Sequence, residues 1–168
     1  MSELAHRIEE RLRGRRAAVV GVGNRLRGDD GAGSHVAERL LAAGAAGVFD
    51  AETVPENYLG ALLAARPEAV LFVDAADHGA AAGACCLVRA GELAARGSST
   101  HAPSLRLLAG LLEAEGIESW MLGIQPAATV VGSGLSPAVA AAVAEVARAL
   151  TAALGANGVA SPAEAGRV

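Results

Sequence analysis

Short, uninterrupted apolar runs alternate along this 168-residue chain with longer segments of helical periodicity. An apolar run without alternating polar residues is typical of a strand buried on both faces, as in a parallel sheet covered by helices. This alternation predicts an α/β fold, a three-layer sandwich around a mostly parallel sheet of about five strands. The expected strands are 17–22, 47–53, 70–73, 85–88 and 120–124, and the expected helices are 2–13, 31–41, 58–65, 103–112 and 136–150.

The length of the chain is in the range of a single domain. Leu4, Ile8 and Leu12 recur every four residues among charged side chains, which predicts an additional leading helix within residues 1–15. We therefore expect one domain over residues 1–154 and, because small residues dominate after Gly155, a disordered tail over 155–168.

Composition excludes several classes of function. All 14 cationic residues are arginines, so the chain has no lysine for a Schiff base or for a Walker-type phosphate site. The net charge of −4 has the wrong sign for binding nucleic acid. The amino-terminal segment is charged, and no stretch has the roughly 18 uninterrupted apolar residues of a membrane span. Together with two adjacent cysteines in an apolar segment, this predicts a cytoplasmic protein without nucleic-acid or membrane partners.

Polar side chains follow the expected strands, where open α/β sheets bind their ligands. Asp29 and Asp30 come after the first strand, Asp74 ends the third, and His101 precedes a leucine-rich helix. Each alone is better explained by a turn or a helix cap, and we expect one aspartate of the pair to cap the helix that follows it. Together, two carboxylates and an imidazole at one sheet edge could form a three-ligand metal site that leaves coordination positions of the metal open.

Three further residues could support this site. Asp77 lies three residues after Asp74. We expect it either to form a hydrogen bond to a metal-ligating side chain or to form a turn. Asn24 and Gln125 are amides at strand ends, where they could bind a peptide, orient ligands or form turns.

The glycine-rich segment after the first strand does not fit a dinucleotide-binding loop. Gly21 and Gly23 have the required spacing, but Leu26 stands where the third glycine should be. Adjacent carboxylates at Asp29 and Asp30 would also repel a phosphate there. Serine-protease chemistry is disfavoured as well, because the sequence has no Gly-x-Ser-x-Gly elbow.

Taken together, these segments resemble the hydrogenase maturation endopeptidases, over about residues 17–152. The most specific part is the string Asn-x-Leu-x-Gly-Asp-Asp-Gly-x-Gly at 24–33. The ending Gly-Ile-Gln-Pro at 123–126 is most similar to the branch that serves formate-hydrogenlyase. The other matching strings are Gly-x-Gly at 21–23, Pro-Glu-Asn at 55–57, Val-Asp-Ala at 73–75 and Thr-His at 100–101.

The resemblance implies an α/β/α sandwich on a twisted five-stranded sheet and a defined activity. Such proteins cleave a C-terminal extension from the precursor of a NiFe-hydrogenase large subunit after nickel insertion. Asp30, Asp74 and His101 match the family's metal-contacting residues, with Asp30 and Asp74 as the catalytic pair, whereas Asp29 matches a motif residue without that role. The nickel would arrive with the precursor. We expect a monomer, because the edge of the cleft must be uncovered for the precursor to dock there. The extra leading helix departs from the family pattern.

Two alternatives stay open at this point. The metal could activate the attacking water, or it could only position the peptide while Asp30 or Asp74 acts as general base. The same three residues could also serve a non-catalytic nickel chaperone.

Overall fold

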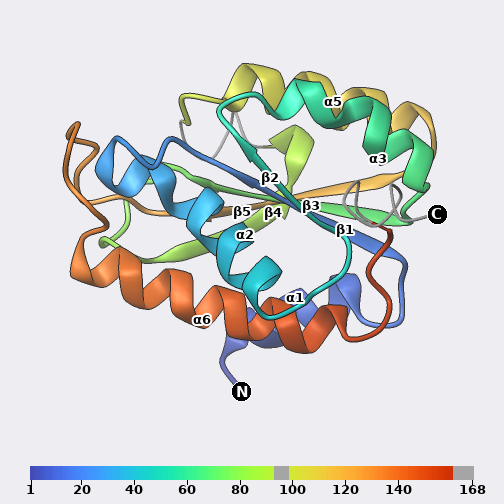
Figure 1. Ribbon diagram of the computed structural model, residues 1–168, viewed down its shortest axis with the longest axis horizontal. Coiled ribbons are helices and arrows are strands. Elements are labelled where there is room, and N and C mark those ends of the chain that lie inside the picture. The colour runs from blue at the N-terminus through green and yellow to red at the C-terminus, as the bar shows by residue number, and fades with distance from the viewer. Residues whose placement is uncertain (93–98, 161–168) are drawn as a thin grey trace.

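A five-stranded sheet forms the centre of the computed structural model, which describes residues 1–92 and 99–160 (Figure 1). The strand order is β2-β1-β3-β5-β4, and all neighbours are parallel except β4, which runs antiparallel to β5. The predicted mostly parallel sheet is confirmed. Its strands are β1 (Ala17–Val22), β2 (Val48–Glu52), β3 (Ala69–Ala75), β4 (Cys85–Arg89) and β5 (Glu118–Ile124).

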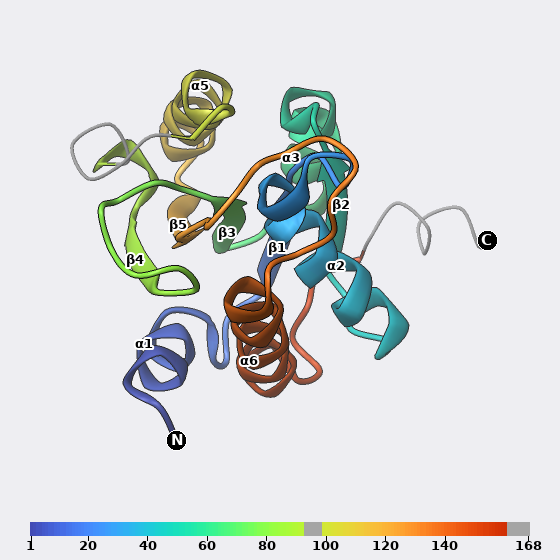
Figure 2. The same cartoon turned by 90° about the vertical axis from the view of Figure 1, so that its left-hand side faces the viewer.

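Helices cover both faces of the sheet, so the predicted three layers are present (Figure 2). The helices α1 (Glu3–Leu12), α2 (Ala32–Ala42) and α6 (Pro137–Leu154) lie on one face. The other face is covered by α3 (Leu59–Ala65) and α5 (Ala102–Ala114). Short 3-10 turns connect these elements: η1 (Gly28–Gly31), η2 (Pro55–Tyr58) and η3 (Ala90–Glu92).

The strand side chains alternate between two cores. In β3, Leu71 and Val73 pack with α1, α2 and α6, whereas Val70 and Phe72 pack with α3 and α5. Every residue of β1 and β3 is buried. Burial on both faces explains why these strands are continuous apolar runs in the sequence.

Among the described helices, only α6 is long and apolar enough to cross a membrane by length and composition. Its buried residues, including Val139, Val143 and Val146, belong to the core cluster shared with α1 and α2. It also carries Glu145 and Arg148. One side of this helix is therefore packed into the core of the sandwich.

The predicted leading helix is present and anchored to the sheet. Ile8 and Leu12 are buried, and Arg7 donates a hydrogen bond of 2.7 Å to the Leu87 carbonyl of β4. The Arg11 guanidinium lies 4.5 Å from the centre of the Trp120 ring. This helix therefore completes one face of the sandwich.

The structure differs from the expected tail at its start. The Val159 amide donates to the Ala17 carbonyl at 3.1 Å, and Val159 is buried, so residues 156–160 lie beside the beginning of β1. The backbone approaches closely at Gly158, where a Cβ atom would be 2.1 Å from the Ala46 carbonyl oxygen. The expectation of disorder is thus wrong for this stretch, while residues 161–168 lie outside the described part of the chain.

Candidate functional site

The predicted site residues converge at the carboxyl ends of the parallel strands. Asp30 lies in η1, directly before α2, and Asp74 is the penultimate residue of β3. A Cβ atom at Gly33 would be 1.9 Å from the Val73 carbonyl oxygen, so only glycine lets α2 begin this close to β3. His101 comes from the amino end of α5, on the opposite face of the sheet.

Asp74 and His101 form a buried hydrogen-bonded pair. The Asp74 side chain is 0% exposed, and its Oδ2 atom lies 3.2 Å from His101 Nδ1. The same oxygen accepts a hydrogen bond from the Ser99 hydroxyl, and Asp74 Oδ1 accepts one from the Ala75 amide at 2.9 Å. Both carboxylate oxygens are therefore engaged within the protein.

The environment favours keeping a proton between these two side chains. The hydrogen bond to Asp74 raises the pKa of His101 against the opposing effect of burial, and the charges of Asp74, Asp30 and Glu56 add to that rise. Burial raises the pKa of Asp74 above its ordinary value, although hydrogen bonds from His101 and Ser99 oppose the shift. Both shifts favour a proton shared between Asp74 and His101 Nδ1.

Thr100 connects this pair to Asp30. Its hydroxyl donates to Asp30 Oδ1 at 3.2 Å and lies 3.3 Å from His101 Nδ1. Asp30 Oδ2 accepts a hydrogen bond of 3.2 Å from the main-chain N–H of Asn24. The three residues expected to form one site are thus neighbours, joined by a hydroxyl that the sequence analysis had not assigned a role.

These side chains are joined by hydrogen bonds instead of forming a preassembled metal cage. Within residues 1–92 and 99–160, no group of three or more His, Cys, Asp or Glu side chains is spaced to hold a metal ion. His101 Nδ1 is held by Asp74, while Nε2 has no hydrogen-bond partner among the described residues. Nε2 is therefore the nitrogen that could ligate a metal, as in sites where a carboxylate holds the other imidazole nitrogen. Metal ligation by Asp30, Asp74 and His101 stays a prediction.

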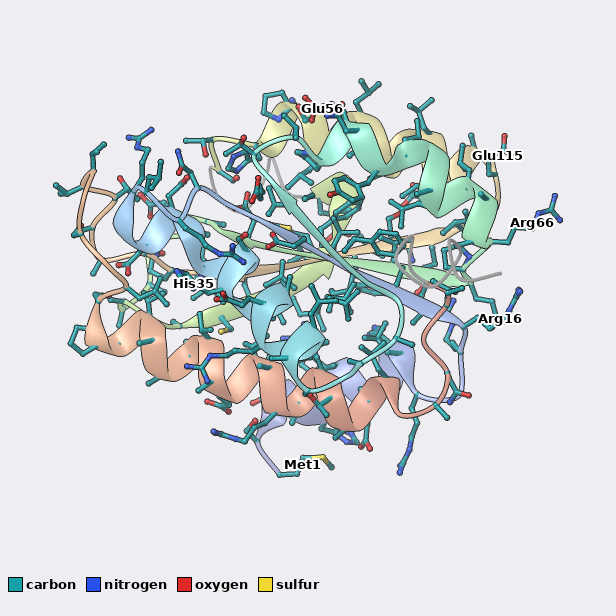
Figure 3. All side chains as sticks on the ribbon, viewed as in Figure 1. Met1, Arg16, His35, Glu56, Arg66 and Glu115 are labelled. Carbon is teal, nitrogen blue, oxygen red and sulfur yellow. The ribbon has the colours of Figure 1, made fainter. Side chains whose placement is uncertain are left out.

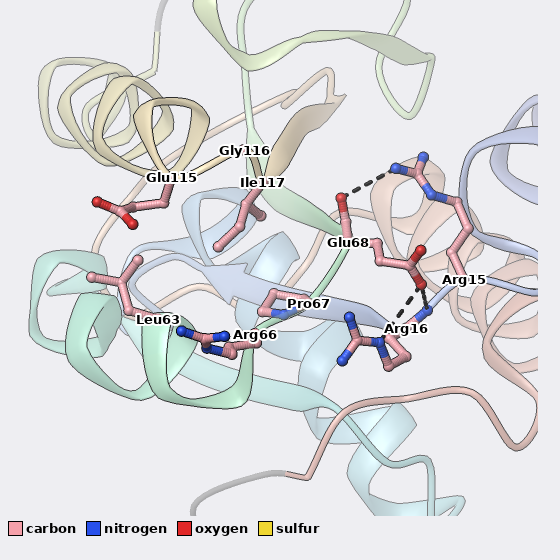
Figure 4. A pocket seen from close by; sticks show the side chains of 9 residues that line it. All are labelled: Arg15, Arg16, Leu63, Arg66, Pro67, Glu68, Glu115, Gly116 and Ile117. Carbon is pink, nitrogen blue, oxygen red and sulfur yellow. Dashed lines mark hydrogen bonds and ion pairs between the residues drawn. The ribbon is translucent and has the colours of Figure 1, made fainter.

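A cavity of about 330 Å³ opens beside Asp30 and Thr100. Its wall also includes Ala75, Asp77, Ser99, Pro126 and Thr129. A larger cavity of about 710 Å³ lies at the other end of the sheet, where Arg16, Arg66 and Glu115 are labelled in Figure 3. None of the predicted site residues lines it, and its Arg15 and Arg16 are bonded to Glu68 (Figure 4). We therefore assign the chemistry to the smaller cavity.

Asp29 does not cap its own helix, which corrects the sequence expectation for the aspartate pair. Gly31 occupies the cap position of α2, and no side chain caps that helix. Asp29 instead accepts hydrogen bonds from the amides of Ala127, Ala128 and Ser136 at 2.8, 3.1 and 2.7 Å, and from the Ser136 hydroxyl at 2.9 Å. The turn of η1 directs the carboxylate toward the loop before α6, whose amides need an acceptor.

The hydrogen bonds of Asp29 also determine its ionisation. Burial raises the pKa of Asp29, but the hydrogen bonds from Ser136, Ala128 and Ala127 outweigh burial and hold the pKa below its ordinary value. The carboxylate is charged at neutral pH. It acts as a clamp between the loop of residues 24–31 and the loop of residues 126–136.

Asn24, Asp77 and Gln125 organise loops around the cavity. Asn24 Oδ1 accepts a hydrogen bond from the Leu26 amide at 2.9 Å, which is the turn that the sequence analysis considered. Gln125 Oε1 accepts from the amides of His78 and Ala80, and its Nε2 atom donates to Asp77 Oδ1 at 3.1 Å. Asp77 also forms a turn with Gly79 and borders the cavity.

Sequence reasoning missed one further charged group near this edge. Asp50 in β2 accepts a hydrogen bond of 2.6 Å from Arg25 and another from Ser34. Arg25 also donates to the Ser34 carbonyl at 3.0 Å. The available signal was an aspartate between the apolar residues Phe49 and Ala51 of a strand, because a charge there needs a partner.

Comparisons with known proteins agree on one family. The family model described as hydrogenase maturation protease matches residues 33–153, a segment that includes Asp74 and His101 and begins just after Asp30. The hydrogenase 3 maturation protease of Escherichia coli K12 is 38% identical over 108 residues, which cover 62% of this chain and 69% of that protein.

Solved structures extend the similarity to most of the fold. The NiFe-hydrogenase maturation protease HycI from Thermococcus kodakarensis superposes with a TM-score of 0.77 at 30% identity, over 88% of this chain and 97% of that one. The endopeptidase HycI from Escherichia coli gives a TM-score of 0.72 at 30% identity, over 86% and 95%.

Proposed function

This chain belongs to the hydrogenase maturation protease family, and on that basis we propose that it removes the C-terminal extension of a NiFe-hydrogenase large-subunit precursor after nickel has been inserted. The protein is an endopeptidase of hydrogenase maturation. We propose its substrate, the dependence of cleavage on nickel and the position of the cut. We further propose that it acts in the cytoplasm as a monomer, with the cavity edge free for the precursor.

One observation carries the proposal. Asp30, Asp74 and His101 come from three separate elements, yet Thr100 joins Asp30 to the Asp74–His101 pair. Asp30 and Thr100 also line one cavity. Two carboxylates and an imidazole are an oxygen and nitrogen donor set that suits nickel. With so few donors, the site would complete the coordination of an ion that the precursor already holds. Binding would then distinguish loaded from empty precursor.

The two aspartates support different roles in the reaction. Both oxygens of Asp74 are engaged by the protein, and the carboxylate is fully buried. Asp74 is therefore suited to hold His101 with Nε2 available to the nickel. Asp30 lines the cavity and is suited to contact the nickel or to take a proton from the attacking water.

The substrate's nickel supplies charge stabilisation for this reaction. A divalent ion polarises a carbonyl and lowers the pKa of a nearby water. The residues of this chain orient the scissile bond in the cavity, and Asp30 can pass the proton that it takes from the water on to the leaving amine.

The direct test is to incubate the purified protein with nickel-loaded precursor. We expect mass spectrometry to detect the loss of one fixed C-terminal peptide, and no cleavage of nickel-free precursor. Asp30→Asn should slow processing by about 100-fold or more, the range for loss of a general base. Asp74→Asn should also slow it, because Nδ1 of His101 loses its charged acceptor.

Glu115→Gln is the matched control, since Glu115 is an exposed carboxylate at the far cavity. It should process precursor at the wild-type rate. Tight binding of the loaded precursor with unchanged mass would instead favour the nickel chaperone. Equal cleavage of nickel-free precursor would remove nickel from recognition.

A further inference from the structure

Two loops form a continuous rim on the cavity side of the molecule. The loop of residues 24–31 and the loop of residues 126–136 lie side by side in both ribbon views (Figures 1 and 2). Backbone hydrogen bonds join them from Gly132 to Leu26 at 2.9 Å, from Asp29 to Ala128 at 3.0 Å and from Gly28 to Ser133 at 3.1 Å. The Asp29 carboxylate adds its four hydrogen bonds. The rim is therefore held as one unit.

This well-bonded rim presents large apolar side chains to solvent. Leu26, Val130 and Val131 are 74%, 63% and 73% exposed. Exposed apolar side chains gathered beside a functional site mark interaction surfaces. The rim is also continuous with the cavity, because Pro126 and Thr129 line the cavity and Val130 follows directly.

We propose that Leu26, Val130 and Val131 form a docking surface for the hydrogenase large-subunit precursor, whose apolar surface beside its C-terminal segment they contact. The inference rests on the proposed function and adds the surface that receives the partner. A second copy of this chain seated on the rim would obstruct the neighbouring cavity. The substrate is the occupant that can cover the rim and still deliver its own terminal segment to Asp30.

The three side chains would contribute to affinity more than to the chemical step. None of them is within the hydrogen-bonded group of Asp30, Thr100 and His101. Burying a large apolar side chain at an interface is worth about tenfold or more in affinity. We therefore expect the rim to lower KM and to leave kcat unchanged.

The test compares rim variants with a matched variant elsewhere. Leu26→Ser and the double variant V130S/V131S remove rim side chains from separate loops. Leu107→Ser is the control, because Leu107 is 63% exposed on α5, away from the rim. Processing kinetics of nickel-loaded precursor should show KM raised about tenfold for each rim variant, with kcat within twofold. The control should match wild type.

Surface plasmon resonance with the same precursor measures binding independently of cleavage. Both rim variants should bind about tenfold more weakly than wild type and the control. Unchanged KM and binding in the rim variants would overturn the docking surface and leave the proposed function standing. A wild-type protein that binds the precursor through the rim but does not cut it would reject the proposed function alone.

Light scattering tests whether a second copy of this chain occupies the rim instead of the precursor. A wild-type dimer that the rim substitutions dissociate would assign the rim to self-association and overturn the proposal. Circular dichroism confirms folding of each variant, and the variant in the other loop decides the question if one fails to fold.

Discussion

Two adjacent aspartates have different tasks in this protein. Asp30 faces the cavity, whereas Asp29 is bonded to a loop about 100 residues further along the chain. No local pattern distinguishes the two, because helix capping is an equally good local explanation for an aspartate before a helix. The resemblance to a family singled out Asp30, which lines the cavity, but the partners of Asp29 depend on the tertiary fold.

The clamp formed by Asp29 should be measurable in stability. Asp29→Asn keeps the size of the side chain but replaces one acceptor oxygen with a donor, so that backbone amides in the 126–136 loop lose their acceptor. We expect the free energy of unfolding to fall by about 1–3 kcal/mol in urea titrations. Glu115→Gln is the comparison, because Glu115 is exposed and its replacement should cost less than about 0.5 kcal/mol. Equal losses would argue against the clamp.

Thr100 is a second residue whose importance appears only in three dimensions. Thr100→Val keeps the β-branched shape and removes the hydroxyl between Asp30 and His101. We expect kcat for precursor processing to fall about fivefold, the equivalent of one hydrogen bond of about 1 kcal/mol. Thr100→Ser should restore most of the activity. Because the residue is exposed, the melting temperature should not change, and a variant with normal kcat would remove Thr100 from the site.

At the scale of elements, the sequence predicted all five strands and the helices around them. Continuous apolar runs mark strands buried on both faces, and β1 and β3 follow this pattern. Periodicity contained no information on the strand order or on the antiparallel direction of β4, because both arise from pairing between distant segments. The docked stretch at 156–160 was missed for the same reason, since its partners are Ala17 and Ala46.

The ion pairs of Glu118, at the start of β5, predict how the free energy of unfolding depends on pH. Glu118 pairs with Arg15 at 3.2 Å and with Arg89 at 3.3 Å. Burial raises the pKa of Glu118, but hydrogen bonds from Arg15 and Trp120 and the arginine charges outweigh burial and lower the pKa. A lowered folded-state pKa means that the stabilisation is complete above the ordinary value of 4.5 and is lost as pH falls through the folded value.

Glu118→Gln should therefore be less stable than wild type at pH 7, by less than about 1 kcal/mol because the pair is partly exposed. The difference should shrink as pH falls below 4.5. Urea unfolding at a series of pH values measures this, with Glu115→Gln as the control that follows wild type throughout. A difference that grows toward low pH would contradict the assignment.

On the scale of the whole molecule, the two ends of the sheet differ in the side chains that they expose. The carboxyl ends of the parallel strands carry the cavity with Asp30 and the apolar rim. The amino ends carry the larger cavity lined by arginines (Figure 4). Arg66 at that far end closes α3 in the left-handed region, with φ of 50°. This conformation favours glycine.

Arg66→Gly should raise the free energy of unfolding by about 0.5–1 kcal/mol, because it removes the steric cost of the left-handed conformation. Precursor processing should keep its wild-type KM and kcat, since the residue is at the opposite end from the cavity with Asp30. Arg66→Ala is the control for loss of the guanidinium without relief of the backbone. A fall in processing with both variants would bring the larger cavity into the reaction.

The clamp at Asp29 has a consequence for protein engineering. Three of its four hydrogen bonds come from main-chain amides at positions 127, 128 and 136, and such donors are supplied by every amino acid except proline. The outward-facing side chains of the segment between them can accordingly be exchanged for those of another enzyme without loss of the anchoring. If the rim receives the precursor as proposed, grafting this segment would redirect the protease toward a different hydrogenase while Asp30 and its neighbours are retained.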